Sequence, residues 1–501
     1  MTTSVSRDPG GEVYAPRSQI AALPPKGKRA VYICTSAQSN TKVHAEVWRN
    51  LMALVAYEKA ILLVGSITYS KAQKGGKRKT AREGSEKEEW WDAKVEPHLF
   101  DTSATIAPGL VWCGELNILP TASDPISGLE SYTGRASSIF PHNKIALTCV
   151  ASPKNAGTKF CYTTGTVTQR NYIQKKAGQK AAFHHGYGAL IVEVDSDGTW
   201  FVRQLNADSD GIIYDLDRCV KDGKVTTGHR PEAIVWGDLH ERQLESKMRI
   251  LAWGKDGILD VLQPYRQVFH DLLDFRSQNH HDRDDPWKTF KKYTENGLGV
   301  EAEIASALCF LDGEATRDWC ESVVVCSNHD MALVRWLKEV DFREDPHNAE
   351  FILEATLAAY RAIRTPSPNL MGQPFYPVEW AFEYAASKLG QPAPPVYFLR
   401  RDEEYLVCKD HGGGIELGMH GDKGANGAKG SLKGFARTGR KCIIGDRHTP
   451  GIFEGAMQVG VMGSLDQGYN EGQSSWSHTN AIVYPNGKRA LFTIYNGKWR
   501  A

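Results

Sequence analysis

The stretch Ala233-Ile-Val-Trp-Gly-Asp-Leu-His240 holds the pattern from which the fold is predicted. Its first four residues are apolar and are followed by a glycine, as is typical of a short buried strand. Asp238 and His240 are two positions apart, so on extended backbone both side chains point to the same side and can face one ion. Such a pair alone is common among ordinary surface residues, so partners elsewhere in the sequence decide its meaning.

Four later segments repeat the arrangement of an apolar run that ends in Asp, Asn or His. In chain order they are Gln267-Val-Phe-His-Asp-Leu-Leu-Asp274, Ser322-Val-Val-Val-Cys-Ser-Asn-His-Asp330, Ile415-Glu-Leu-Gly-Met-His-Gly-Asp422 and Lys441-Cys-Ile-Ile-Gly-Asp-Arg-His448. Ligand sites of α/β sheets lie beyond the carboxyl ends of the strands. We therefore expect the five segments to converge on one cleft.

This order of motifs resembles the calcineurin-like metallophosphoesterase superfamily, whose pattern is DxH, GDxxD, GNH followed by Asp or Glu, then H and GHxH. The resemblance covers about residues 233–501 and implies an αββα sandwich with two metal ions at the strand ends. It places Asp238, His240 and His448 on the first ion, Asp271 between both ions, and Asn328 and His420 on the second. It also implies that His329 lies close to the scissile phosphate as general acid or transition-state stabiliser, and that Asp330 positions it.

The resemblance implies a phosphodiesterase that depends on two divalent metal ions. Mixed His, Asp and Asn ligands suit Mn, Fe, Co or Zn better than the all-oxygen sites that Mg prefers. We favour Mn, with Fe, Co, Zn and Mg as alternatives. In the implied mechanism a hydroxide between the ions attacks phosphorus in line with the leaving oxygen, which His329 protonates.

Three positions depart from the superfamily pattern. His270 and Ser327 stand where glycines precede the second and third motifs, and a loop can absorb both changes. Asp446 replaces the first His of GHxH, a ligand of the second metal ion in the superfamily. A carboxylate there can still ligate the metal ion, so Asp446 remains a candidate ligand, but it adds negative charge and favours harder ions. We therefore expect weakened activity, whether Asp446 is natural or engineered.

A basic, glycine-rich tract joins the fourth and fifth motifs. We expect it to contact a phosphate backbone through Lys423, Lys429, Lys433 and Arg447. A solvated surface is the alternative interpretation of this tract. The segments 420–431, 445–452 and 469–472 are similar to phage-encoded metallophosphoesterases of T-five-like tailed phages that degrade host DNA. This similarity implies a DNase, with DNA as partner, in the cytoplasm of an infected bacterium.

Two other functions remain open at this point. One is a phosphodiesterase or phosphatase for small substrates; a protein phosphatase fits less well, because Asp330 stands where those enzymes carry Glu. The other is a non-catalytic scaffold whose site decayed at Asp446.

Composition excludes several classes of protein. The 501 residues contain 60 Lys and Arg against 59 Asp and Glu, a net charge of +1, and 41% are hydrophobic. A folded chain is therefore expected, and neither a disordered protein nor a DNA-wrapping polycation fits. The ten cysteines form no CxxC pair, which favours a reducing cytoplasm over a disulfide framework. We expect no secretion signal and no membrane span, and a homo-oligomer is compatible with the sequence.

The predicted fold class is α/β in two domains. A flexible arm covers residues 1–28, an N-terminal α/β, β-rich domain of unknown role covers 29–228, and the metallophosphoesterase domain covers 229–501. Expected elements are a strand–helix–strand unit at 30–34, 43–58 and 61–65, hairpins at 192–202 and 480–495, and helices at about 299–311, 331–340 and 347–363. The charged segment 71–92 is predicted to be a solvated loop, with a nucleic-acid-binding arm as the alternative.

The remaining histidines are given ordinary structural roles. His280 and His281 are predicted to lie in a solvated loop, with the border of the cleft as the alternative. His184, His185 and His411 are expected to be surface or core residues.

Overall fold

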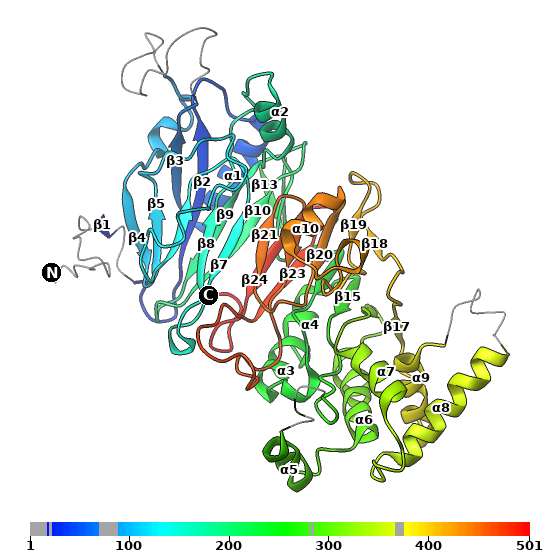
Figure 1. Cartoon of the computed structure of the whole chain (residues 1–501). Helices are drawn as coiled ribbons and strands as arrows, with labels where there is room; N and C mark the ends of the chain where they lie inside the picture. Colours follow the sequence, from blue (N-terminus) through cyan, green and yellow to red (C-terminus); the bar gives the residue numbers. More distant parts are fainter. Residues whose placement is uncertain (1–17, 20–22, 70–88, 280–281, 283–284, 366–374) are drawn as a thin grey trace.

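The computed structural model describes residues 18–19, 23–69, 89–279, 282, 285–365 and 375–501 (Figure 1). Most of the predicted arm 1–28, most of the charged segment 71–92, and His280 and His281 lie outside the described residues. Among the described helices, none is both long and apolar enough to cross a lipid bilayer.

The N-terminal sheet contains the two predicted strands at 30–34 and 61–65. Its strand order is β10 (Trp200–Asn206), β9 (Gly188–Val194), β2 (Ala30–Gln38) and β3 (Ile61–Ile67). The strand–helix–strand unit is confirmed, because α1 (Ala45–Glu58) connects the parallel pair β2 and β3. The hairpin of β9 and β10 is also confirmed. A small sheet of β11 (Ile213–Asp215), β12 (Arg218–Lys221) and β13 (Lys224–Thr226) follows.

Helix α1 shows why this unit folds locally. It begins after His44, whose ring accepts a hydrogen bond from the Val47 amide, and it ends at Lys59, which has a left-handed backbone. Val47, Leu51 and Leu54 recur at helical spacing and are buried against the N-terminal sheet.

A second sheet carries three of the five motifs. Its order is β17 (Val396–Phe398), β16 (Glu321–Val324), β15 (Arg266–Phe269), β14 (Ala233–Val235), β23 (Thr479–Val483) and β24 (Arg489–Thr493). The strands β14 to β17 are parallel, so their carboxyl ends lie at one edge. The hairpin of β23 and β24 confirms the expected terminal hairpin.

A long sheet combines strands from both halves of the chain. It runs through β1 (Ser18–Gln19), β4 (Ser103–Ala107), β5 (Leu110–Cys113), β6 (Ser137–Phe140), β8 (Lys159–Thr163), β7 (Leu147–Val150), β21 (Gly451–Phe453), β22 (Ala456–Gln458), β20 (Lys441–Ile444), β19 (Ile415–Glu416) and β18 (Leu406–Val407). The two halves meet where Leu147 pairs with Ile452. The predicted division at 228/229 stays a prediction, but this sheet is continuous across it.

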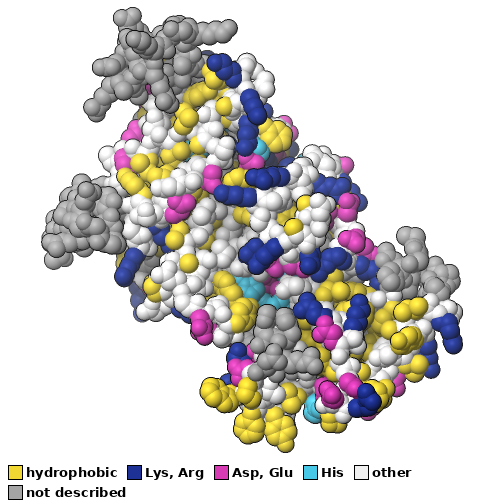
Figure 2. Space-filling view, viewed as in Figure 1, with side chains coloured by type: hydrophobic (Ala, Val, Ile, Leu, Met, Phe, Trp, Pro, Cys, Tyr) yellow, Lys and Arg dark blue, Asp and Glu magenta, His cyan; other side chains and the backbone are white. Residues whose placement is uncertain are grey.

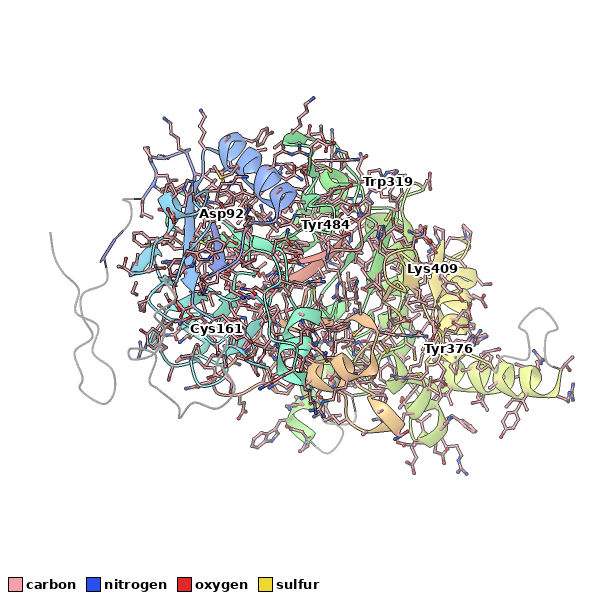
Figure 3. All side chains as sticks on the ribbon, turned by 90° about the horizontal axis from the view of Figure 1, so that it is seen from above. Asp92, Cys161, Trp319, Tyr376, Lys409 and Tyr484 are labelled. Atoms are coloured by element: carbon pink, nitrogen blue, oxygen red, sulfur yellow. The ribbon has the colours of Figure 1, made fainter. Side chains whose placement is uncertain are left out.

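The long sheet packs across the N-terminal sheet and the second sheet. These two lie edge to edge, because the Leu491 amide on β24 donates a 2.7 Å hydrogen bond to the Gln204 side chain on β10. Val192 of the N-terminal sheet and Val268 of the second sheet share one apolar core with Ile443 of the long sheet. Seen from above, side chains fill this interior, with Tyr484 inside and Lys409 at the periphery (Figure 3).

Helices cover the outer face of the second sheet. They are α3 (Ser246–Trp253), α4 (Ile258–Leu262), α6 (Val300–Phe310), α7 (Asp330–Glu339), α8 (Ala349–Arg364) and α9 (Pro377–Lys388). The expected helices at 299–311, 331–340 and 347–363 are confirmed as α6, α7 and α8. Trp236 and Phe269 on this face pack against Leu259 and Ile304 from the helices.

Shorter helices are α2 (Lys176–Phe183), α5 (Pro286–Thr294) and α10 (Leu432–Phe435). Helix α10 places Phe435 against Ile444 on the long sheet. The mixed α/β class is confirmed.

A buried ion network ties β9, β10 and β11 together. Arg203 on β10 donates to both carboxylate oxygens of Asp215, at 2.7 and 2.8 Å, and to Glu193 at 3.2 Å. Burial alone would raise the pKa of Asp215, but the charge and hydrogen bonds of Arg203 outweigh burial and hold that pKa below its ordinary value.

We expect acid to weaken the fold through Asp215. Because the folded pKa is depressed, its stabilising effect is present above the unfolded pKa of about 3.9 and is lost as pH falls through the folded value. Asp215→Asn should lower the free energy of unfolding at pH 7 by about 3 kcal/mol, measured by urea denaturation. Below about pH 4, this free energy should fall less with decreasing pH in the variant than in the wild type. Asp222→Asn is the control, because its pair with Arg49 is exposed and should contribute about 0–1 kcal/mol. Equal losses in both variants would contradict this account.

Candidate metal centre

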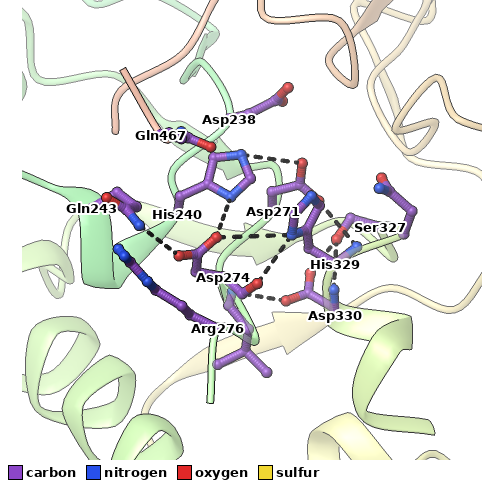
Figure 4. A network of polar contacts seen from close by, with 12 residues as sticks. Asp238, His240, Gln243, Asp271, Asp274, Arg276, Ser327, His329, Asp330 and Gln467 are labelled. Atoms are coloured by element: carbon purple, nitrogen blue, oxygen red, sulfur yellow. Dashed lines mark hydrogen bonds and ion pairs between the residues drawn. The ribbon is translucent and has the colours of Figure 1, made fainter. Parts of the chain in front are cut away.

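The five motifs lie at the ends of their strands and meet in one place. Asp238 and His240 follow β14, Asp271 follows β15, Asn328 and His329 follow β16, His420 follows β19, and Asp446 and His448 follow β20. The first three strands belong to the second sheet and the last two to the long sheet. Figure 4 shows Asp238, His240, Asp271 and His329 around a common space. The site therefore forms between the edges of two packed sheets.

One side of the centre is formed by two histidines and a carboxylate. The Nε2 atoms of His240 and His448 are 2.9 Å apart, and Asp238 Oδ2 lies 3.3 Å from His448 Nε2. All three side chains are buried. Burial and the facing His240 hold the pKa of His448 well below its ordinary value, so its ring is neutral, as a metal ligand must be.

The other side is formed by His420 and Asn328. His420 Nε2 lies 2.9 Å from Asn328 Oδ1 and 3.4 Å from Asp271 Oδ2. The same Asp271 oxygen is 3.7 Å from His240 Nε2. Asp271 thus lies between the two groups, the position that the resemblance implies for a bridging carboxylate.

The arrangement fits divalent cations. Both carboxylate oxygens of Asp238 are buried without a hydrogen-bond partner in the described part of the chain. Burial and the neighbouring Asp271 raise the pKa of Asp238 well above its ordinary value. Burying two such carboxylates side by side is costly unless positive charge compensates them. Buried His and Asp groups that could hold a metal ion are therefore present.

Two residues of the centre, His270 and Asp274, were not predicted as site residues. His270 Nδ1 lies 3.2 Å from His420 Nδ1, and its ring belongs to a possible ligand group with Asp238 and His420. Asp274 Oδ1 lies 3.3 Å from His240 Nδ1, and a carboxylate in this position orients a ligand imidazole. The DxxD spacing of 271 and 274 was a signal for Asp274, and the histidine in place of the motif's glycine was the signal at His270.

The ring of His329 is held by Asp274 and not by Asp330. His329 Nδ1 is 3.0 Å from the Asp274 carbonyl oxygen, and the side chain remains one-fifth exposed. Asp330 instead accepts hydrogen bonds from the Leu273 amide at 2.9 Å and the Ser327 hydroxyl at 2.7 Å. The positioning of His329 that the resemblance implies for Asp330 is thus corrected, because the Asp330 carboxylate is occupied in joining two loops.

Asp446 lies beside the centre but outside its ligand groups. Its carboxylate contacts Arg447 Nε at 3.4 Å, and among the described residues it belongs to none of the groups whose atoms converge on one point. Burial raises its pKa above the ordinary value. Within the described part of the chain, Asp446 is therefore next to the convergent ligand groups and not a member of one.

The structure places two of the four predicted phosphate-binding residues in one groove and the other two outside its lining. Lys423 and Lys429 line a groove together with Asn328 and Asp446. Lys433 Nζ pairs with Asp124 at 2.9 Å and lies over the Phe453 ring, outside the groove lining, and its contact with phosphate stays a prediction. Arg447 donates to the Gly430 carbonyl at 2.8 Å and so supports the loop that carries both lysines.

Unfavourable backbone conformations gather at the centre. His240, Asp271, Asp446 and His448 have φ values of 46°, 45°, 74° and 56°. A left-handed conformation costs a residue with a side chain about 1–2 kcal/mol, and such strain clusters at functional sites.

The fold and this centre define a mixed α/β protein with buried histidines and carboxylates able to hold a metal ion. No protein-family model matches the chain, and no solved structure matches it significantly. Protein A1 of Escherichia phage T5 is 35% identical to the chain over 489 residues, which are 95% of the chain and 83% of that protein. The chain therefore belongs to the family of phage T5 Protein A1, and the similarity supports a phage origin.

Gly445 offers a test of the centre in which no ligand residue is replaced. A Cβ atom at 445 would lie 2.1 Å from Asp238 Oδ1, so Gly445→Ala must displace that carboxylate. We expect Mn²⁺ affinity, measured by isothermal titration calorimetry, to fall by about 10- to 100-fold. Gly313→Ala is the control, since nothing lies within 4 Å of its added Cβ. Unchanged affinity in Gly445→Ala would show that Asp238 does not bind the metal.

Proposed function

We propose that the protein is a two-metal-dependent phosphodiesterase of the calcineurin-like metallophosphoesterase superfamily, and that it acts as a DNA nuclease. The observation that carries the proposal is the position of Asp271, within 3.4 Å of His420 on one side and 3.7 Å of His240 on the other. The second sheet is covered by helices on one face and packs against the long sheet on the other, which supports an αββα sandwich.

The residues divide into two ligand sets. Asp238, His240 and His448 would hold one ion, Asn328 and His420 the other, and Asp271 both. Two divalent ions supply Lewis acidity, since they neutralise a phosphate and stabilise the attacking and leaving oxygens of an in-line displacement. The mixed nitrogen and oxygen donors support Mn, with Fe, Co, Zn and Mg as alternatives.

His329 is the proton donor in this proposal. Burial alone would lower its pKa, but Asp271 and the Asp274 carbonyl and carboxylate outweigh burial and raise the pKa above its ordinary value. The raised pKa favours the protonated ring, which can donate to the leaving oxygen of a phosphodiester. Its partial exposure beside the ligands gives a substrate access to it.

DNA is the proposed substrate because the groove beside Asn328 is basic. Arg335, Lys338, Arg401, Lys423 and Lys429 line it, against Asp422 and Asp446. A polyanion matches this excess of positive charge. With the similarity to a phage protein, we propose the cytoplasm of an infected bacterium as the place of action.

The position of Asp446 favours a second candidate, a scaffold with weakened catalysis. Its carboxylate lies outside the ligand groups and adds negative charge next to Asp271 and Asp238. The second ion would then have one ligand fewer than in the superfamily pattern.

A panel of substrates separates these functions. The purified chain and its Asp446→His variant would be incubated with plasmid, single-stranded DNA, bis-p-nitrophenyl phosphate and p-nitrophenyl phosphate, with and without Mn²⁺. We expect Mn²⁺-dependent DNA degradation, faster in Asp446→His because the ligand is restored. Cleavage of the small esters alone would indicate a small-substrate enzyme. If neither protein cleaves any of the four substrates, the result would indicate a scaffold. An unchanged Mn²⁺-dependent rate in Asp446→His would exclude the hypothesis that Asp446 inactivates the enzyme.

Replacement of His329 tests its role as proton donor. His329→Gln should lower kcat on DNA by about 10²- to 10⁴-fold while Mn²⁺ binding, measured by calorimetry, is retained. Because the acid must be protonated, the wild-type rate should fall as pH rises through its pKa, and this alkaline decline should be absent from the variant. His411→Gln, an exposed residue outside the centre, is the control. Full activity of His329→Gln would exclude the role.

A further inference from the structure

A groove of about 580 Å³ leads away from the candidate metal centre at Asn328 and Asp446. Helix α7 forms one wall, with Arg335 and Lys338, and the loop between 420 and 430 forms the opposite wall. In Figure 2, dark blue basic side chains gather next to the cyan histidines at the centre of this face. Neither Arg335 nor Lys338 was expected from the sequence to take part in the site.

The loop wall places two like charges opposite each other. Lys423 and Lys429 are paired in an antiparallel bridge, closed by hydrogen bonds from Gly424 N to the Ala428 carbonyl at 2.7 Å and from Gly430 N to the Asp422 carbonyl at 3.1 Å. Like charges in directly opposite positions destabilise a strand pair. A bound anion between the two ammonium groups would remove this repulsion.

The loop is also built to approach its neighbours closely. A Cβ atom at Gly430 would lie 1.8 Å from the Gly421 carbonyl oxygen, so only glycine fits there. Gly421 follows His420 directly, and Arg447 holds the Gly430 carbonyl. The lysine pair is therefore fixed relative to the ligand His420.

The helix wall adds two more cations at a spacing of one turn. Arg335 and Lys338 are three positions apart on α7, which starts directly after His329. Met331 and Val334, the apolar members of the lining, lie on the same face of the helix. The side chains of Arg335, Lys338, Lys423 and Lys429 are exposed and form no ion pair within the described ranges, whereas Arg401 pairs with Asp422.

The groove matches a chain of phosphates better than one small ester. Four cations without a protein counter-ion exceed the charge of a single phosphodiester, and Asp446 supplies one negative charge nearby. The volume of about 580 Å³ is that of a pocket for a small number of chemical groups. Apolar side chains between basic walls suit the alternation of bases and phosphates along one strand.

We propose that this groove binds a single strand of DNA beyond the scissile phosphate, with successive phosphates between Arg335 and Lys338 on one wall and Lys423 and Lys429 on the other, and a base or sugar over Met331 and Val334. The inference rests on the proposed nuclease function and deepens it, because it names single-stranded DNA as the bound form and adds Arg335 and Lys338 of α7 as binding residues.

The test compares an Arg335→Gln, Lys338→Gln double variant with wild type and with a charge-matched control, Arg361→Gln, Arg364→Gln, whose arginines are exposed on α8 away from the groove. Binding of a fluorescent 20-nucleotide oligothymidylate and of a 20-base-pair duplex is measured by anisotropy in EDTA over a range of salt concentrations. Cleavage of the oligonucleotide and of bis-p-nitrophenyl phosphate is measured with Mn²⁺.

We expect the double variant to bind the oligothymidylate at least tenfold more weakly, with the slope of log K against log salt reduced by about 1.4, because two phosphate contacts are lost. Its kcat/KM should fall at least tenfold more on the oligonucleotide than on bis-p-nitrophenyl phosphate. Unchanged oligonucleotide binding, equal losses on both substrates, tighter binding of the duplex, or the same loss in the α8 control would each overturn the inference. If the wild type binds the strand through these residues but cleaves neither substrate, the proposed DNA-binding groove is supported and the proposed nuclease function is wrong.

Discussion

The Asp271 carboxylate lies in a fully buried position between two groups of histidines, and the rest of the site is arranged around the charge that this creates. Asp238 is buried nearby, so two carboxylates share a region of low dielectric constant. The buried imidazoles respond in opposite ways. Asp271 and Asp238 raise the pKa of His420 to about 10 against the effect of burial, while burial lowers that of His270 to about 3. Divalent cations would compensate the carboxylates and restore neutral ligand rings.

The fold supplies the rigidity that such a centre needs. Motifs from the second sheet and from the long sheet meet because these sheets share one apolar core. The left-handed backbone at His240, Asp271 and His448 turns each loop back towards the cluster at a cost that the packed sheets must overcome. Gly445 leaves the space that Asp238 occupies. The ligands are thus placed by the ends of strands and not by flexible loops alone.

The sequence predicted what local patterns determine. Each motif joins an apolar run to a polar end, so the strands β14, β15, β16, β19 and β20 and their convergent side chains could be expected before the structure. The long sheet could not, because the pairing of Leu147 with Ile452 joins distant segments that carry no local signal. The partners of individual side chains were equally inaccessible: Asp274 instead of Asp330 holds His329, and Lys433 pairs with Asp124, because side-chain direction depends on the packed loops.

The account depends on two metal ions on either side of one carboxylate. Crystals grown with Mn²⁺ and measured at the manganese absorption edge test this directly. The account predicts two anomalous peaks about 3.5–4 Å apart, one beside His240 and His448, the other beside His420 and Asn328, with Asp271 contacting both. A single peak, or peaks without Asp271 between them, would contradict it.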